Sequence, residues 1–482
     1  MSFPRPGKKK EKKKDPHKEY ALVTYIFSAL FLVMIGYLLW FLIARSDRFI
    51  NNSYNSKRID AFAKNTLRGD ILDREGEVLA TTELLPDKSE VRSYPKGNRY
   101  AHVVGYISNG KMGLEQTANY YLLRSHANPL LRAKNAFSDE KDPGDSLVTT
   151  LLDPVQQASW EALGDYRGAV ITMNPETGEI LSCVSKPDFD PNEMERNYEA
   201  LAASGDGVLL NRASQGRYAP GSTFKILTTL EFLREHPAKA KKYTFDCDGS
   251  FTSDGKEIHC FHNTAHGEED LASSFANSCN ASYASLGLTL KPGEFRKTAQ
   301  TMFFDKPIIC SLPTELPRFL LEEGASDAEK METAIGQGKT YMTPLQLLLI
   351  VSAIENKGMA KKPVLCREII NNEGRTVERF PLGDERRLMT EEEAAVLESF
   401  LRGVVEEGTG RGLMNDAYEA YGKTGTAEIN SAGDCHAWFT GYAKAEGKDP
   451  IAITVIMEGA GAGSSYAVPA AKKVLDTYFS YE

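Results

Sequence analysis

An uncharged apolar stretch near the N-terminus constrains this chain more than any other feature of its sequence. Residues 21–44 contain no charged side chain, and as a helix they are long enough to cross a bilayer core of about 30 Å. Residues 1–20 carry eight basic and three acidic side chains. The positive-inside rule therefore predicts a single-pass anchor with a cytoplasmic basic tail and an extracytoplasmic body. A cleaved signal peptide is the alternative, but the run is longer than an ordinary signal core and no small-x-small site follows Ala44.

The charge balance separates the tail from the rest of the chain. The tail has a net charge of +5, so the other residues carry −14 of the total of −9. Such a body does not bind nucleic acid through a basic surface, and we expect no nucleic-acid partner. Apolar and charged fractions of 41% and 26% are typical of a globular protein, and 482 residues are enough to bury a large core.

The seven cysteines are odd in number and scattered, so they predict no disulfide framework. Cys247 and Cys260 flank a turn-rich stretch and can form one bridge outside the membrane. Whether they are bridged stays open at this point. His259, His262 and His266 lie near Cys260 and suggest zinc, but the gap between the two cysteines does not match common ligand spacing, so we expect no metal and no cofactor.

Beyond the anchor, the pattern of apolar and turn-forming residues predicts two domains. Residues 45–143 show short strand-like runs and turns without a catalytic constellation, which indicates a small β-rich pedestal. In residues 144–482 we expect strands on either side of a helical middle, and hence an α/β (α+β) fold whose one sheet is built from both ends of the domain. The expected strands are 146–152, 168–173, 180–184, 420–428, 436–443 and 451–457, and the expected helices are 154–163, several within 222–349, and 468–479.

Ser222 stands at the predicted start of a helix. Pro220 and Gly221 break the preceding loop, and apolar residues then recur at helical spacing. Free backbone N–H groups at a helix N-terminus favour developing negative charge. Lys225 follows one turn later on the same face, where an amine can take a proton from a serine nucleophile. The Ser-x-x-Lys pattern also begins at Ser93, Ser108, Ser138 and Ser253, so it is not specific alone.

Two further motifs supply polar groups of matching chemistry. Ser278-Cys279-Asn280 falls between helix-like runs 270–277 and 281–288, so its hydroxyl and its amide can face one cavity. Lys423-Thr424-Gly425-Thr426 lies within a predicted strand. Alternation places Thr424 and Thr426 on one face and Gly425 on the other, where a helix can approach closely. We expect Lys423 to curl around the strand to join the threonines.

These three segments, in their order along the chain, resemble the three motifs of penicillin-binding proteins and serine β-lactamases: Ser222-x-x-Lys225, Ser278-x-Asn280 and Lys423-Thr424-Gly425. Additional segments resemble class B penicillin-binding proteins, in a short form similar to penicillin-binding protein A: Arg68-Gly-Asp-Ile-Leu-Asp73-Arg74-Glu-Gly76, Gly113-Leu-Glu115, Ala334-Ile-Gly336-Gln337-Gly338, Thr343-Pro344-Leu345-Gln346, Glu407-Gly408-Thr409-Gly410 and Ala437-Trp438-Phe439-Thr-Gly441. The resemblance covers nearly everything after the anchor. It implies the serine β-lactamase/penicillin-binding transpeptidase fold, with a mainly antiparallel sheet flanked by helices.

The resemblance also implies a function, namely D,D-transpeptidation of peptidoglycan stem peptides through an acyl-enzyme that β-lactams also form. Ser222 would be the nucleophile, Lys225 its base and Ser278 the proton shuttle. Asn280 would hold the peptide, and the terminal carboxylate would bind to Lys423, Thr424 and Thr426. The N–H groups of Ser222 and Thr426 would form the oxyanion hole. Class B members work beside a polytopic SEDS-family glycan polymerase, which is the expected membrane partner.

Other functions remain as alternatives. A D,D-carboxypeptidase differs only in using water as the acceptor, although its low-molecular-mass type carries the membrane attachment at the other end. A β-lactamase hydrolyses its acyl-enzyme quickly and has no need of anchor and pedestal. A β-lactam sensor or idle scaffold would show more membrane spans or degenerate motifs, whereas one span and three complete motifs are present.

Overall fold

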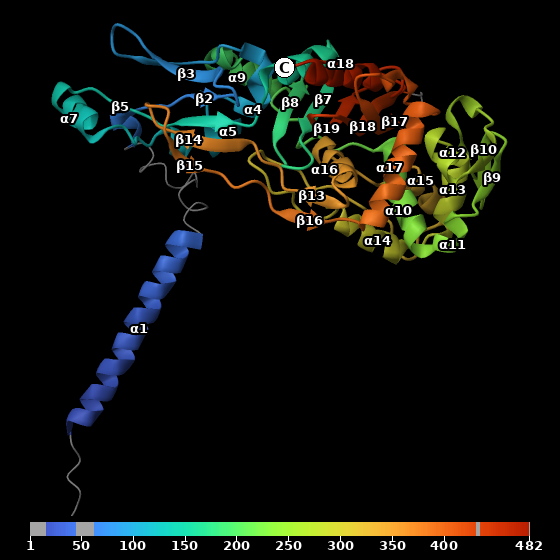
Figure 1. Ribbon diagram of the computed structural model, residues 1–482, viewed down its shortest axis with the longest axis horizontal. Coiled ribbons are helices and arrows are strands. Elements are labelled where there is room, and N and C mark those ends of the chain that lie inside the picture. The colour runs from blue at the N-terminus through green and yellow to red at the C-terminus, as the bar shows by residue number, and fades with distance from the viewer. Residues whose placement is uncertain (1–15, 45–61, 430–433, 482) are drawn as a thin grey trace, which may run out of the picture. The chain divides into compact units, whose positions relative to one another are not determined.

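The computed structural model describes residues 16–44, 62–429 and 434–481 (Figure 1). Residues 1–61 and 62–482 separate into two compact units, which are described in turn. Residues 1–15 of the predicted basic tail and residues 45–61 of the predicted pedestal lie outside the described residues.

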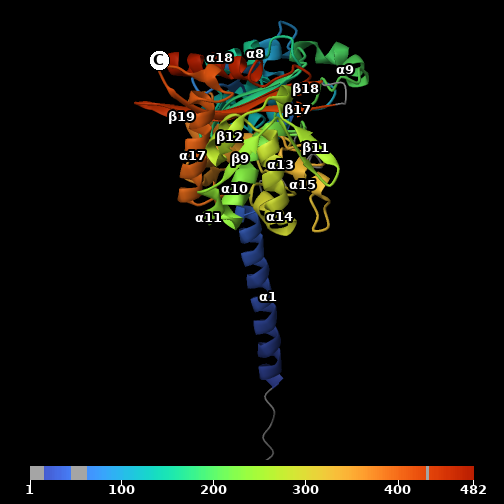
Figure 2. The ribbon, with the colours of Figure 1, turned by 90° about the vertical axis from the view of Figure 1, so that its right-hand side faces the viewer.

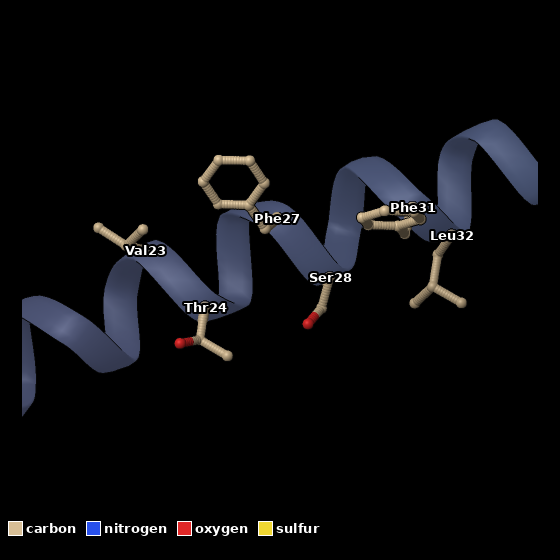
Figure 3. A pocket seen from close by; sticks show the side chains of 6 residues that line it. All are labelled: Val23, Thr24, Phe27, Ser28, Phe31 and Leu32. Atoms are coloured by element: carbon tan, nitrogen blue, oxygen red, sulfur yellow. The ribbon is translucent and has the colours of Figure 1, made fainter.

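Helix α1 (Pro16–Ala44) contains the apolar stretch. Its segment Tyr20–Phe41 has a mean hydropathy of 2.3, and residues 20–40 are exposed. Figure 3 shows the small polar side chains of Thr24 and Ser28 on one side of this helix, where the Thr24 hydroxyl donates to the Tyr20 carbonyl at 2.9 Å. An exposed apolar helix of this length fits a single-pass membrane anchor.

The centre of the second unit is a five-stranded antiparallel sheet. In spatial order its strands are β17 (Glu419–Glu428), β18 (Cys435–Ala445), β19 (Lys448–Met457), β7 (Gly168–Met173) and β8 (Ile180–Lys186). Segments far apart in the sequence therefore form one sheet, as predicted. β17 is an edge strand of this sheet, so its outer edge is available for other contacts.

Helices cover both faces of this sheet (Figure 2). On one face lie α8 (Asp153–Leu163) and α18 (Ala467–Ser480), and on the other lie α16 (Pro344–Glu355) and α17 (Glu391–Glu406). Successive side chains of β7 point to opposite faces of the sheet. Val170 therefore belongs to the core that contains α18, and Ile171 belongs to the core that contains α16. Coverage on both faces explains why these strands are almost continuously buried.

A second sheet of six strands is built around the N-terminal part of the unit. Its spatial order is β15 (Thr376–Arg379), β14 (Cys366–Ile370), β6 (Ser146–Thr149), β2 (Ile71–Leu72), β3 (Val78–Leu84) and β4 (Glu90–Ser93). The expected strand 146–152 is shorter than predicted and belongs here rather than to the central sheet. The boundary predicted at residues 143/144 therefore runs through a shared sheet.

The helical middle was only partly predicted. Its main helices are α10 (Lys225–Glu235), α12 (Leu271–Ala276), α13 (Asn280–Thr289), α14 (Pro292–Thr301) and α15 (Asp327–Ala334). Between α10 and α12 the chain forms β9 (Thr244–Cys247), β10 (Ser250–Ser253), β11 (Lys256–His259) and β12 (Gly267–Asp270), so four strands interrupt the helical middle expected over 222–349. Strand β9 pairs with β12 and β10 with β11, which closes a small lobe beside α13.

Smaller elements complete the unit. They are α4 (Ala101–Val104), α5 (Gly113–Thr117), α6 (Asn119–Leu122), α7 (Pro129–Ser138), α9 (Met194–Ala203) and α11 (Pro237–Ala240), with the strand pairs β1 (Thr66–Leu67) with β5 (Asp142–Pro143) and β13 (Met359–Lys361) with β16 (Glu385–Arg387).

Candidate active site

The segment that carries Ser222 is a short 3-10 turn, η4 (Gly221–Phe224), which leads directly into α10. The helix expected from Ser222 thus begins as a tighter turn and becomes α-helical at Lys225. Gly221 has a φ of 53° and lies so close to β17 that an added Cβ would stand 2.6 Å from the Thr426 carbonyl oxygen. As the second residue of the turn, Ser222 keeps its backbone N–H free of partners within the turn.

Lys225 is the buried base candidate beside Ser222. Its side chain is fully buried, and its Nζ lies 3.2 Å from Ser222 Oγ. The same Nζ donates to the Ser278 carbonyl and to Asn280 Oδ1, both at 2.7 Å. Burial lowers the pKa of Lys225 to about 8. A neutral amine has two protons and one lone pair, so two donations to carbonyl oxygens leave the lone pair for the Ser222 hydroxyl.

Ser278 joins the two lysines of the site. It lies in the connection between α12 and α13 with a φ of 59°, a left-handed conformation that turns the chain sharply. Its Oγ accepts from Lys423 Nζ at 2.8 Å and lies 3.3 Å from Lys225 Nζ. Asn280 opens α13, and its Nδ2 donates to the His259 carbonyl at 3.0 Å. The hydroxyl and the amide of this motif therefore do face one site.

The third motif lies on the edge strand β17. An added Cβ at Gly425 would stand 2.9 Å from Thr223 Cγ2, so the absence of a side chain lets the Ser222 turn approach, as predicted. Lys423 lies on the same face as Gly425 by strand alternation and reaches Ser278 directly. The expectation that Lys423 must curl around the strand is therefore wrong. Its own burial, followed by the charge of Lys225, lowers the pKa of Lys423 well below its ordinary value.

These groups line one cavity of about 880 Å³. Its wall includes Ser222, Ser278, Asn280, Thr424, Gly425 and Thr426, whereas the two lysines are buried beneath it. Thr426 Oγ1 accepts from the Gly463 N–H at 3.4 Å. All eight residues predicted for the site are thus brought together by η4 and the start of α10, by the α12–α13 connection and the start of α13, and by β17.

The sequence interpretation missed Thr409 as a site residue. Thr409 also lines the cavity, and its hydroxyl lies 2.5 Å from that of Thr424. It belongs to the Glu407-Gly408-Thr409-Gly410 segment, which had been recognised only as a family feature. Gly408 packs against α12, where an added Cβ would stand 2.2 Å from the Ala276 carbonyl oxygen. That close packing sets the position of Thr409, and it was not visible in the sequence.

Two family models match the chain, and both concern penicillin-binding proteins. The penicillin binding protein transpeptidase domain matches residues 168–476, and the penicillin binding protein A dimerisation domain matches residues 68–147. The curated peptidoglycan D,D-transpeptidase PbpA of Mycolicibacterium smegmatis is 30% identical over 77% of this chain and 79% of its own length.

Solved structures agree with these matches. The D,D-transpeptidase domain of a peptidoglycan glycosyltransferase from Eggerthella lenta has a TM-score of 0.77 and 27% identity, covering 86% of this chain and 99% of that one. Penicillin-binding protein A from M. tuberculosis, as its imipenem acyl-enzyme complex, has a TM-score of 0.76 and 25% identity over the same shares of the two chains. With its three motifs gathered around one cavity, the chain belongs to the penicillin-binding protein transpeptidase family.

Proposed function

We propose that the chain is a serine D,D-transpeptidase that cross-links peptidoglycan stem peptides through an acyl-enzyme on Ser222. The observation that carries the assignment of the nucleophile is the environment of Lys225. Its Nζ lies 3.2 Å from Ser222 Oγ, while both of its 2.7 Å partners are oxygens that can only accept. No such environment surrounds the look-alike at Ser93, where Lys96 pairs with the carboxylates of Glu77 and Asp153.

The chemistry begins with proton transfer from the Ser222 hydroxyl to the neutral Lys225 amine. Ser222 Oγ forms a bond to the carbonyl carbon between the two terminal D-alanines of the donor stem. Backbone N–H groups of Ser222 and Thr426 stabilise the oxyanion, at about 3 kcal/mol for each donor. The proton passes from Lys225 through Ser278 to the leaving amine, and D-alanine departs as the C–N bond breaks. An amine of a neighbouring stem then attacks the ester carbon, so that a C–N bond forms, the bond from this carbon to Ser222 Oγ breaks, and the proton of the amine returns to Ser222 Oγ.

The edge strand β17 provides the means of holding the donor peptide. An extended peptide can pair with the outer edge of β17, while Asn280 contacts its backbone from the opposite wall. The terminal carboxylate meets the hydroxyls of Thr424 and Thr426 at the cavity wall, and Lys423 lies buried behind that wall. Penicillins present a comparable carboxylate and acyl group, and they acylate Ser222 in the same orientation.

Ser222→Ala tests the nucleophile. We expect the purified full-length variant to lose covalent labelling by a fluorescent penicillin, because it lacks the hydroxyl that lies 3.2 Å from Lys225 Nζ. Ser93→Ala is the matched control and should label normally, since it alters the same Ser-x-x-Lys pattern at β4. Persistent labelling of folded Ser222→Ala would refute the assignment.

The rival acyl-transfer reactions are separated by the fate of the acyl-enzyme. Incubated with donor and acceptor stems, the protein should form cross-linked dimers and release D-alanine, whereas release of D-alanine without dimers would indicate a carboxypeptidase. Steady hydrolysis of penicillin, rather than a persistent adduct, would indicate a β-lactamase. Intact labelling combined with no turnover of either stem would indicate a sensor or scaffold.

The membrane assignment also belongs to this proposal. The tail 1–20 is cytoplasmic, 21–44 is the anchor, 45–143 is an extracytoplasmic pedestal, and 144–482 is the transpeptidase domain. A SEDS-family glycan polymerase docks on the anchor and pedestal, for which α1 offers the Thr24 and Ser28 side (Figure 3). Co-purification from membranes should be lost when residues 21–120 are exchanged for an unrelated anchor. Protease accessibility of the body only from the outer side of intact cells tests the topology.

A further inference from the structure

Three thiols and one imidazole converge behind the wall of the active-site cavity. The ligand atoms of Cys247, Cys260, His266 and Cys279 all lie within 4.8 Å of one another. The Sγ atom of Cys260 is 3.7 Å from Cys247 Sγ and 3.7 Å from Cys279 Sγ, and Cys247 Sγ is 3.4 Å from His266 Nδ1. All three cysteines are free and buried, whereas His266 is half-buried and reaches the cavity.

These separations suit a tetrahedral metal ion better than a disulfide. A disulfide requires sulfur atoms about 2.05 Å apart. Around tetrahedral zinc, with Zn–S of about 2.3 Å and Zn–N of about 2.0 Å, two sulfurs lie about 3.8 Å apart, and a sulfur and a nitrogen about 3.5 Å apart. The observed distances of 3.7 and 3.4 Å fall close to both values. Three cysteines and one histidine are, moreover, a common ligand set of closed structural zinc sites.

The fold brings the four ligands from separate turns. Cys247 ends β9, Cys260 follows β11, His266 precedes β12, and Cys279 is the N-cap of α13. Backbone N–H groups point at the sulfurs, from Ala281 to Cys260 at 3.5 Å and from Ser282 to Cys279 at 3.4 Å. Such outer contacts stabilise thiolates at a helix N-terminus and orient metal ligands.

We propose that Cys247, Cys260, His266 and Cys279 bind one structural Zn²⁺ ion, which fixes the connection carrying Ser278 and Asn280. Cys279 is the middle residue of that motif, so its ligation anchors the two functional side chains on either side of it. Zinc also ties the motif to the small lobe of β9–β12, whose short strands bury little apolar surface on their own. The ion is therefore a positioning element and touches no substrate.

The sequence interpretation expected no metal because the gap between Cys247 and Cys260 does not match common ligand spacing. It weighed His266 and Cys260 together with His259 and His262, and the two latter histidines are not part of the cluster. The fourth ligand, Cys279, was assigned only to the catalytic motif. The open question of a bridge between Cys247 and Cys260 is answered by the same proposal, since both thiols are used as metal ligands.

Metal content of the full-length protein, purified in detergent with reductant and without added metal or chelator, tests the site. We expect one zinc per chain by elemental analysis, and Co²⁺ substitution should give thiolate-to-cobalt absorption bands. His266→Ala and Cys279→Ser should lose the zinc, and His266→Cys should retain it because it keeps four ligands. Cys310→Ser and Cys435→Ser are matched controls that leave the ligands intact and should keep full zinc content.

The predicted effect of zinc on acylation of Ser222 rests on the proposed function, whereas the predicted zinc content does not. The zinc site and the proposed function can therefore fail separately. Zinc removal or His266→Ala should lower the acylation rate constant for penicillin about tenfold or more, and His266→Cys should restore it. Zinc-free protein with full acylation, or a Cys247–Cys260 disulfide found by mass spectrometry in fully active protein, would overturn the proposal. Stoichiometric zinc with acylation unchanged on its removal would overturn the positioning role.

Discussion

Lys423 Nζ donates to Ser278 Oγ at 2.8 Å, although the two residues stand 145 positions apart in the chain. The same hydroxyl oxygen lies 3.3 Å from Lys225 Nζ, so two buried lysines share one serine. Two charges so close together in a buried site repel each other, which favours the neutral form of one amine. Ser278 therefore stands where a proton can pass between the base and the leaving group.

The pH dependence of acylation should report the protonation state of Lys225. Burial lowers the pKa of this amine to about 8, and only its neutral form has a lone pair for the Ser222 proton. The penicillin acylation rate should thus be low below this pKa, rise through pH of about 8 and level off above it. Stopped-flow measurement of acylation by a chromogenic β-lactam checks this pH profile. A rate constant that stays the same from mildly acidic to alkaline pH would contradict the role of Lys225 as the base. Lys225→Arg stays charged and should lose about 100-fold or more at every pH.

Lys423 and Ser278 should act as one unit. Lys423→Ala removes the amine and Ser278→Ala the hydroxyl, and each should reduce acylation about 100-fold, because each breaks the same contact at the site. The double variant should lose clearly less than the product of the two losses. Lys444→Ala on β18 is the control, since its amine pairs with Glu398 away from the cavity. Strictly multiplicative losses in folded proteins would contradict the coupling.

Gly336 sets the position of the Ser222 turn. It has a φ of 76°, and an added Cβ would stand 2.0 Å from the Gly221 carbonyl oxygen. Gly336→Ala should displace η4 and reduce acylation about tenfold or more, since small misplacement of a nucleophile is costly. Gly403→Ala is the control in α17, where nothing lies within 4 Å, and it should raise stability by about 0.5–1 kcal/mol. Acylation at the wild-type rate in Gly336→Ala would show that the turn tolerates the shift.

Glu115 holds the N-terminal part of the second unit together. It is fully buried between Arg68 and Arg92, with Nε-to-carboxylate distances of 2.7 Å to both. Burial raises the pKa of this carboxyl, but the two guanidinium groups outweigh that effect and hold it below its usual range. Glu115→Ala leaves two buried cations unpaired and should lower the free energy of unfolding by about 3–5 kcal/mol.

Chemical denaturation of the body without its anchor, read by tryptophan fluorescence, measures this loss, provided that the shortened wild type is first shown to fold. Glu294→Ala serves as the control, because its partner Lys297 is largely exposed and surface ion pairs contribute little to stability. Equal effects of the two substitutions would show that burial does not distinguish these ion pairs.

Local patterns in the sequence were sufficient for much of the fold and the site. The uncharged run predicted α1. Strand-like patterns predicted β7, β8, β17, β18 and β19, with bounds that agree with the structure within a few residues. The proline–glycine break and the helical spacing after it located Ser222 and Lys225. These features depend on residues that are neighbours in the chain, so short-range periodicity carries the information.

Only the tertiary structure decided the features that join remote segments. Strands β14 and β15 pair with the N-terminal sheet, which no periodicity could reveal, because sheet partners are chosen by packing between distant residues. The face from which Lys423 reaches Ser278, the place of Thr409 and the convergence of Cys279 with Cys247, Cys260 and His266 have the same origin. The sequence by itself determined which chemical groups the site contains, whereas the packing of η4, α13 and β17 determined the distances at which they meet.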